Sequence, residues 1–499
     1  MKLTDLNPLY DVYLDDLAQW SKQDSLWQDK ARRTLRAARK NAASEDDLLK
    51  LVHDVQRLRK IFLCGLEHNE AFHKTVRQAN PPVWKRFTAP PADPALQQSL
   101  GDKLYNADPA KHDVPVFYIG NGARKVAPRV LARALEDNVS VFPVITDAAF
   151  DAAIMHFADE DGVKKLAADY LQATENVTTR ISARANDNKA VPLKPKPENT
   201  ALFASLTSPF NDRAGSGKMH FTLTILPTAQ DARHDGMNYR DYTKLFFEMC
   251  DQPWDAVGKA HQALIALLND AETIRFTNDE GTDISMNIDG FTFCNSLIAR
   301  NVPGSEVFSA PHLDSVEGKI VSKGLFIPKS NGGIIENLTM VFEKGVLRHW
   351  HADKGQDIFE RVINTDEGAR RIGELGIGTN PHLKRHSCNG LLVEKISGSF
   401  HLALGAAYEM TDYVGDPVTV DNGNRSKIHW DITTMLIGKQ GRIIVDGKTI
   451  MENGLFTDPQ MDVLNRGWES IPRERRPAYW QDYDFEAHKQ QQASLIKTL

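Results

Sequence analysis

The sequence predicts an α/β fold of the mixed α+β kind that contains more than one domain. The first indication is the length of 499 residues, since single hydrophobic cores rarely grow beyond about 250–300 residues. The second is a strand–helix–strand pattern that starts near residue 113 and favours parallel strands with a right-handed crossover. The third is the later alternation of short strands with a few helices and many glycines.

Residues 1–100 are expected to form a helical N-terminal extension. Ser44 precedes the run EDDLLKLVHDVQRLRKIF, and Asp47 completes a loose capping box three residues later. Apolar residues in this run recur at helical spacing. Five prolines between residues 81 and 94 then predict a connector, because proline cannot continue a helix.

Residues 101–235 are expected to form an α/β domain. VPVFYI and VSVFPVI are apolar strands, and the segment from Arg124 to Glu136 between them is helical in pattern. The glycine pair in GNG after the first strand lacks a third glycine and a distal acid, so it indicates a tight turn. AGSGK resembles a phosphate-binding loop, but Asp212 stands where its first glycine belongs, and we reject that interpretation.

Residues 236–460 are expected to form a second domain, after a polar gap at 186–200 and a strand from His220 to Leu226. Helices are predicted around 239–249 and 256–269, and IRFTNDEGTDISMNI is typical of a hairpin that turns at Asp-Glu-Gly. The tail, residues 461–499, is polar with isolated aromatics and is expected to lie on the surface or on a partner subunit.

The composition excludes several classes of partner and site. Sixty basic against sixty-six acidic residues give a net charge of −6, which does not favour nucleic acid as a partner. We expect no membrane span and no secretory signal, because no apolar run approaches about 18 residues and the N-terminus lacks a signal pattern. Four scattered cysteines without a CxxC pair argue against thiolate zinc and favour a reducing, cytoplasmic environment. Sixteen histidines leave nitrogen and oxygen as the expected metal ligands.

The segment SKIHWDIT is the first candidate for chemistry. In a strand, residues i and i+2 lie on one face, so His429 and Asp431 project together while Trp430 faces the core. Such a pair can supply two ligands to one metal or to adjacent metals. Taken alone, it equally fits a surface salt bridge.

The segment SGSFHLALGAAYEM is the second candidate and contains good helix formers. We expect a helix in which His401 and Tyr408 lie two turns apart on one face, with the Tyr408 hydroxyl pointing back toward His401. The alternative is a buried histidine and a tyrosine on an amphipathic helix. Two glutamates complete the candidates: Glu374 opens a short glycine-rich strand, and Glu306 follows a Pro-Gly turn. Either glutamate alone fits a solvated charge.

Together, the four segments resemble the metal-binding motifs of the aminopeptidase T family, the thermophilic metalloproteases with two metal ions. The resemblance rests on NVPGSEVFSAP, the GE of RRIGELGIG, VEKISGSFHLALG with its tyrosine seven residues after the histidine, and IHWD. It covers about residues 113–455. Val393 stands where the family often has an acid, and the helical N-terminal segment is an addition to the usual family domain.

The resemblance implies a two-domain metallo-aminopeptidase that cleaves N-terminal residues from short peptides. It implies two divalent ions (Zn²⁺, Co²⁺ or Mn²⁺) with a bridging water nucleophile, and a homodimer. The implied ligands are Glu306, Glu374, His401, His429 and Asp431, with Tyr408 as the active-site tyrosine. Glu374 is the candidate for a bridging ligand or a proton shuttle, and the sequence leaves both roles open.

Two alternatives remain at this point. His401, His429 and Asp431 alone would form the two-His-one-carboxylate site of an iron-dependent ring-cleaving dioxygenase of related fold. A non-catalytic binding protein that retains the scaffold is the other. Among nearby residues, His312 is a candidate to line the pocket and Lys395 to set its charge. The pair His349 and His351 is expected to lie on an exposed strand.

Overall fold

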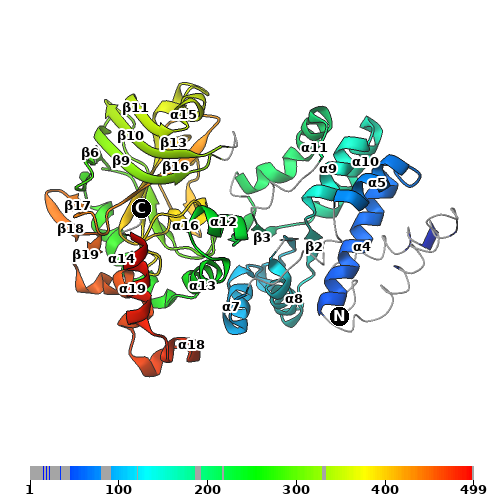
Figure 1. Ribbon diagram of the computed structural model, residues 1–499, viewed down its shortest axis with the longest axis horizontal. Helices are drawn as coiled ribbons and strands as arrows, with labels where there is room; N and C mark the ends of the chain where they lie inside the picture. Colours follow the sequence, from blue (N-terminus) through cyan, green and yellow to red (C-terminus); the bar gives the residue numbers. More distant parts are fainter. Residues whose placement is uncertain are drawn as a thin grey trace. The chain divides into compact units, whose positions relative to one another are not determined.

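The computed structural model describes residues 45–79, 91–120, 122–185, 193–215, 218–328 and 333–496, together with five single positions before residue 45. The chain divides into two compact units, Met1–Thr228 and Ala229–Leu499 (Figure 1). Most of the predicted proline connector and part of the polar gap lie outside the described residues. The finer division at residues 100, 235 and 460 stays a prediction.

The first unit contains a four-stranded, all-parallel sheet in the order β2-β1-β3-β4. Its strands are β1 (Pro115–Ile119), β2 (Phe142–Ile145), β3 (Thr179–Ala185) and β4 (His220–Leu226). Helix α8 (Ala127–Glu136) joins β1 to β2, which confirms the predicted strand–helix–strand unit. Helix α11 (Pro197–Gly215) ends within the AGSGK segment and strand β4 comes after it, the reverse of the strand-to-helix order around a phosphate-binding loop.

Helices of the N-terminal segment pack onto this sheet and its neighbouring helices. Helix α4 (Glu45–Leu63) contacts β2, and α5 (Glu70–Ala79) contacts α9 (Ala148–Phe157). Phe72 of α5 and Phe150 of α9 are buried with their ring centroids 5.9 Å apart. Among the described residues, the remaining long helices of this unit are α7 (Pro94–Leu104), α10 (Glu160–Thr174) and α11 (Pro197–Gly215).

The second unit contains two large sheets. The eight-stranded sheet has the order β11-β10-β9-β6-β5-β17-β18-β19, and the five-stranded sheet has the order β16-β13-β12-β8-β7. The first comprises β5 (Thr273–Thr277), β6 (Asp283–Asn287), β9 (Glu317–Phe326), β10 (Ile335–Glu343), β11 (Val346–Lys354), β17 (Arg442–Val445), β18 (Lys448–Glu452) and β19 (Leu455–Phe456). The second comprises β7 (Cys294–Ser296), β8 (Glu306–Ser309), β12 (Ile372–Gly378), β13 (Ser399–Gly405) and β16 (His429–Met435).

The hydrophobic core of this unit includes residues from both sheets. Phe276 of β5 stacks on Phe400 of β13 with ring centroids 4.0 Å apart, and residues of α14 (Trp254–Asn269) belong to the same core. The predicted hairpin is present as the antiparallel pair β5–β6, and the other predicted helix is α13 (Tyr239–Cys250). Among the described residues, no helix combines the length and apolarity needed to cross a membrane.

The predicted helix through His401 and Tyr408 is wrong. Residues 399–405 form strand β13, which pairs with β12 on one side and β16 on the other. Phe400, Leu402 and Leu404 face the core at a period of two, and these contacts outweigh the local helix propensity of the segment. Gly405, with φ at +106°, ends the strand.

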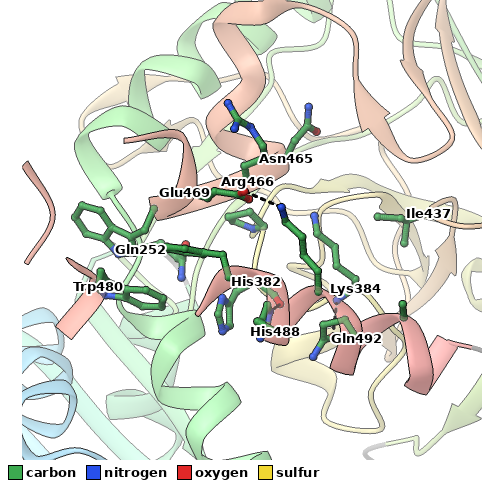
Figure 2. A pocket seen from close by; sticks show the side chains of 15 residues that line it. Gln252, His382, Lys384, Ile437, Asn465, Arg466, Glu469, Trp480, His488 and Gln492 are labelled. Atoms are coloured by element: carbon green, nitrogen blue, oxygen red, sulfur yellow. Dashed lines mark hydrogen bonds and ion pairs between the residues drawn. The ribbon is translucent and has the colours of Figure 1, made fainter. Parts of the chain in front are cut away.

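The C-terminal segment packs against its own unit through α17 (Asp462–Arg466), α18 (Ala478–Gln481) and α19 (Phe485–Ile496). Trp480 is fully buried, so this aromatic anchors the segment. The segment also forms one wall of a pocket (Figure 2).

Candidate metal centre

Four neighbouring strands carry the five side chains that the resemblance implies as ligands. Glu306 is on β8, Glu374 on β12, His401 on β13, and His429 and Asp431 on β16. Antiparallel cross-strand partners point to the same face of a sheet. The register pairs Glu306 with Gly378, His401 with Gly376, Asp431 with Ala403, and His429 with Gly405. All five side chains therefore project from one face.

The residues opposite these side chains are small, and at one position the reason is visible. A Cβ atom added to Gly376 would lie 2.0 Å from Nε2 of His401, so no other residue leaves room for the imidazole there. The sequence predicted that glycine beside Glu374 allows a close approach. The group that approaches is the ring of His401.

Glu374 lies at the centre of the cluster. Its Oε1 atom is 3.6 Å from Nε2 of His401, and its Oε2 atom is 3.0 Å from Nε2 of His429. His401 Nε2 is also 3.6 Å from Glu306 Oε2, and His429 Nε2 is 3.6 Å from Asp431 Oδ1. One carboxylate thus faces both imidazoles, each of which faces a second carboxylate.

The buried polar atoms of this cluster fit a divalent cation. Glu374 Oε2 and His429 Nε2 are buried without a hydrogen bond within the described part of the chain. His429 Nδ1 must donate to the carbonyl oxygen of Ala406, 2.8 Å away, so Nε2 of the neutral ring keeps its lone pair toward Glu374. Potential ligand atoms of Glu374, His429 and Asp431 lie within 4.8 Å of one another. This nitrogen and oxygen set suits Zn²⁺, Co²⁺ or Mn²⁺.

The carboxylates of the cluster favour positive charge at the two imidazoles. Burial alone would lower the pKa of His429, but Asp431 and Glu374 raise it to about 11. His401 behaves in the same way. Burial disfavours its charged form, but Glu374 and Glu306 favour it, and its pKa rises to about 9. Burial disfavours the carboxylate of Glu374, yet His401 and His429 hold its pKa below the usual value.

Lys395 and Ser296 bind the carboxylate of Glu306 from outside the set of candidate ligands. Lys395 is fully buried, and its ammonium group donates to Glu306 Oε1 and lies 3.3 Å from Glu394 Oε2. Ser296 Oγ donates to the same oxygen of Glu306 at 2.9 Å, which leaves Oε2 directed to His401. Lys395 therefore sets the local charge, as the sequence suggested. Sequence reasoning missed Glu394, although its position beside Lys395 was an available signal. Burial and the charge of Asp431 raise the pKa of Glu394 to about 8.

Tyr408 reaches the cluster by a different route from the predicted one. It follows β13 in an irregular segment, and its ring centroid lies 4.9 Å from that of His429 and 5.6 Å from that of Phe308. The residue is 40% exposed. The structure thus places Tyr408 beside His429, on the open side of the cluster, and the predicted approach to the His401 end of a helix is wrong.

The other histidines singled out in the sequence do not belong to the cluster of Glu306, Glu374 and Asp431. His312 is exposed, bonds to the carbonyl oxygen of Asp289 at 2.8 Å and packs on Phe291. His349 and His351 are exposed on β11, as predicted, and His351 lies 3.4 Å from Asp353.

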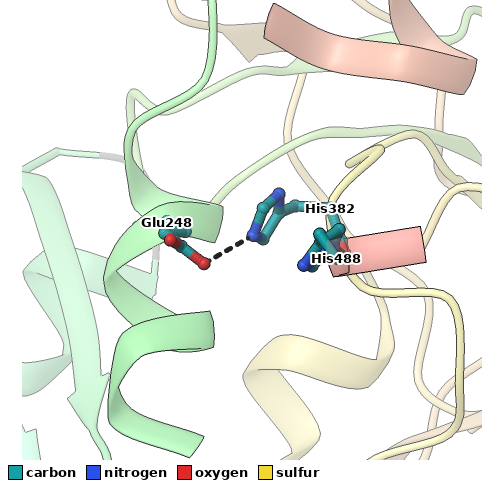
Figure 3. Close-up of side chains that lie close together, drawn as sticks. All are labelled: Glu248, His382 and His488. Carbon is teal, nitrogen blue, oxygen red and sulfur yellow. Dashed lines mark hydrogen bonds and ion pairs between the residues drawn. The ribbon is translucent and has the colours of Figure 1, made fainter. Parts of the chain in front are cut away.

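A second cluster of potential ligands was not predicted. It joins Glu248 of α13, His382 and His488 of α19, which are far apart in sequence (Figure 3). Glu248 Oε2 is 2.9 Å from His382 Nε2, and the two histidine rings stack with centroids 4.1 Å apart. The hydroxyls of Tyr479 and Tyr483 donate to Glu248 at 2.5 and 3.1 Å. Both carboxylate oxygens already accept hydrogen bonds, so we interpret this group as a clamp, here called the Glu248 clamp, that holds the C-terminal segment.

A family model and several known proteins match the chain, and the family model covers the residues that build the centre. The family model described as thermophilic metalloprotease (M29) matches residues 110–456. Aminopeptidase T of Thermus aquaticus is 31% identical over 219 residues, which are 40% of this chain and 51% of that protein. Aminopeptidase AmpS of Bacillus subtilis (strain 168) is 33% identical over 167 residues, which are 31% of this chain and 40% of that protein. The chain thus spans about half, or less, of the curated relatives it matches.

The fold has a solved counterpart. Wild-type AmpT from Thermus thermophilus superposes with a TM-score of 0.58 and 21% sequence identity, over 73% of this chain and 99% of that chain. At this identity the likeness concerns the fold.

Proposed function

The chain belongs to the thermophilic metalloprotease (M29) family, and we propose that it is a metal-dependent aminopeptidase that removes N-terminal residues from short peptides. The observation that carries this proposal is the single face of a buried sheet on which two imidazoles and three carboxylates converge. The matched relatives are named as aminopeptidases, which supports the same activity.

In the proposed site, Glu306, Glu374, His401, His429 and Asp431 hold two divalent ions. Such ions supply Lewis acidity and lower the pKa of water. Three carboxylates offset most of the charge of two such ions, and the central position of Glu374 suits both a bridging role and proton transfer. Tyr408 is the most exposed of these six residues, at 40%, which suits a hydroxyl that donates to the oxyanion of the substrate.

A metal-content measurement coupled to peptide cleavage tests this function. Purified protein is treated with a chelator, reloaded with Zn²⁺, Co²⁺ or Mn²⁺, and assayed on aminoacyl-anilides and a peptide library. We expect about two ions per chain and release of single N-terminal residues only when metal is present. Glu374→Gln should abolish activity, whereas Glu343→Gln, on the exposed end of β10, should not. A reloaded protein that cleaves no N-terminal residue would rule out the proposal.

The same measurement separates the hydrolase from the dioxygenase alternative. A single iron site needs only His401, His429 and Asp431, whereas Glu306 and Glu374 also face the imidazoles. One iron per chain with oxygen uptake would favour the dioxygenase.

We further propose that the protein acts in the cytoplasm as a homodimer. Four free cysteine thiols, three of them buried, support a reducing compartment. Analytical ultracentrifugation of the full chain tests the dimer.

A further inference from the structure

A cavity of about 240 Å³ lies between the C-terminal segment and the body of the second unit (Figure 2). Lys384 and His382 line it from the body, and Trp468, Trp480, His488 and Gln492 line it from the C-terminal segment. The family match ends at residue 456, so ten of the fifteen residues that line the cavity lie outside the family domain, and none of the fifteen is a candidate metal ligand. The cavity therefore does not belong to the candidate metal centre.

Two hydrogen-bond donors in the wall have no partner among the described residues. They are Nζ of Lys384 and Nε2 of Gln492, both buried. Gln492 is 3% exposed, and its Oε1 atom accepts from the backbone N–H of Lys384 at 3.3 Å, so its amide is held next to Lys384. Buried donors are paired in the great majority of cases, because an unmade hydrogen bond costs about 1–3 kcal/mol. Burial also lowers the pKa of Lys384 to about 7, as expected for an ammonium group without a counter-ion.

The other cations of the wall have their own carboxylates. Lys489 binds Glu469 at 2.6 Å and Glu486 at 2.9 Å, and Arg466 binds Asp462 at 2.9 Å. His488 contributes no charge near neutral pH, because burial and His382 lower its pKa to about 3. Lys384 is thus the cation of this wall for which the described residues provide no anion.

The remaining wall combines three aromatic side chains with Pro381, Ile437 and Ala493, and it includes two polar side chains, Gln252 and Asn465. The rings of Trp468 and Trp480 are stacked with centroids 6.2 Å apart, and Phe485 lies 6.2 Å from Trp480. An apolar cavity of about 150 Å³ is large enough for benzene, so this one accommodates a six-membered ring with a short polar substituent. The Glu248 clamp, through His382 and His488, fixes one side of the cavity.

We propose that this cavity binds a small carboxylate with an aromatic body. The carboxylate accepts hydrogen bonds from Lys384 Nζ and Gln492 Nε2, and the ring packs against the tryptophans. This assignment uses both unpaired donors, the uncompensated charge and the apolar wall, and it does not depend on the proposed peptidase activity.

Calorimetric titration of the full chain with phenylacetate tests the proposal, with benzyl alcohol as the uncharged analogue. We expect saturable binding of phenylacetate and binding of benzyl alcohol that is weaker by about tenfold or more, since hydrogen bonds to charged groups are among the strongest. Lys384→Met should weaken phenylacetate by a similar factor. Lys448→Met, an exposed lysine on β18 of the same unit, is the matched control and should bind like the wild type.

A second variant covers the case in which Lys384→Met fails to fold. Gln492→Glu is nearly isosteric and places a carboxylate beside Lys384, so it should abolish phenylacetate binding and raise Tm. Equal affinity of the wild type for phenylacetate and benzyl alcohol would overturn the proposal. So would wild-type affinity in either Lys384→Met or Gln492→Glu.

Discussion

At the scale of single residues, the candidate centre depends on a glycine that leaves room for a ligand. Gly376 lies opposite His401 on the neighbouring strand, and the imidazole occupies the space that a Cβ atom would need. His401 in turn faces Glu306 and Glu374. A methyl group at residue 376 must therefore move the ring away from both carboxylates.

We expect Gly376→Ala to lower metal content and peptidase activity by about a hundredfold, since displacements of about 1 Å in an active site have effects of this size. Gly390→Ala is the matched control, because an added Cβ at Gly390 meets nothing within 4 Å and its backbone is not left-handed. For each variant, mass spectrometry measures the metal content and anilide cleavage measures the peptidase activity. Wild-type metal content in Gly376→Ala would show that the His401 position is not critical.

Lys395 offers a second test at this scale. Its buried ammonium group compensates Glu306 and Glu394, and removing one partner of a buried ion pair costs about 3–5 kcal/mol. Lys395→Met should therefore lower the free energy of unfolding of the chelated protein by about this amount, and by less once divalent metal is bound. Urea unfolding with and without metal measures the difference. Lys354→Met, which breaks the exposed pair with Glu336, should change stability by less than about 1 kcal/mol; an equal loss in both variants would contradict the buried role.

At the scale of secondary structure, the sequence predicted some elements well because their information is local. The period of two in SKIHWDIT places His429 and Asp431 on one face of β16, as predicted. The segment from Ser399 to Tyr408 was mispredicted because its conformation depends on pairing with β12 and β16, which are distant in sequence. The Glu248 clamp was missed for the same reason: Glu248, His382 and His488 are far apart in sequence and meet only in the folded unit.

The clamp predicts how the C-terminal segment is held. Glu248→Ala removes the acceptor of His382, Tyr479 and Tyr483, and hydrogen bonds to a charged group contribute about 1.5–3 kcal/mol each. We expect the segment to open at least about 30-fold more often, which corresponds to about 2 kcal/mol.

Limited trypsin digestion measures this opening, because Arg473 and Arg475 lie in the segment and neither precedes a proline. Glu343→Ala, an exposed glutamate at the end of β10 of the same unit and away from these arginines, should leave the cleavage rate unchanged. If Glu248→Ala is cleaved no faster than the wild type, the clamp does not hold the segment.

At the scale of the whole molecule, the sequence indicated the mixture of parallel and antiparallel sheets and the family to which residues 110–456 belong. It did not indicate that several histidines outside the centre would be buried and neutral. Burial lowers the pKa of His261 to about 4, where Asn295 and Thr379 bind its ring nitrogens at 2.7 Å. Burial and Arg385 lower the pKa of His386 to about 4, and that of His488 lies near 3.

These three histidines predict a loss of stability in mild acid. An unfolded histidine takes up a proton near pH 6.5, whereas these remain neutral in the native state down to about pH 4. The unfolded state then binds more protons, so stability falls as the pH decreases from 6.5 to 4.5, before most carboxylates titrate. In the chelated protein the raised pKa values of His401 and His429 act in the opposite direction, but their stabilisation is almost complete at pH 6.5 and adds little to the slope. The raised pKa of Glu394 opposes the loss by about as much as one histidine.

Each buried neutral histidine should contribute about 2–3 kcal/mol to the acid destabilisation, at about 1.4 kcal/mol per pH unit. His386 is the most suitable for substitution, because its Nε2 makes no hydrogen bond with the described residues and its ring packs against Phe326. His386→Leu should keep near-wild-type stability at pH 7 and lose about 2–3 kcal/mol less than the wild type by pH 4.5. Urea unfolding of chelated protein between pH 4.5 and 7 measures this, with exposed His349→Leu as the control. Parallel pH profiles for His386→Leu and the wild type would mean that His386 titrates normally in the native state.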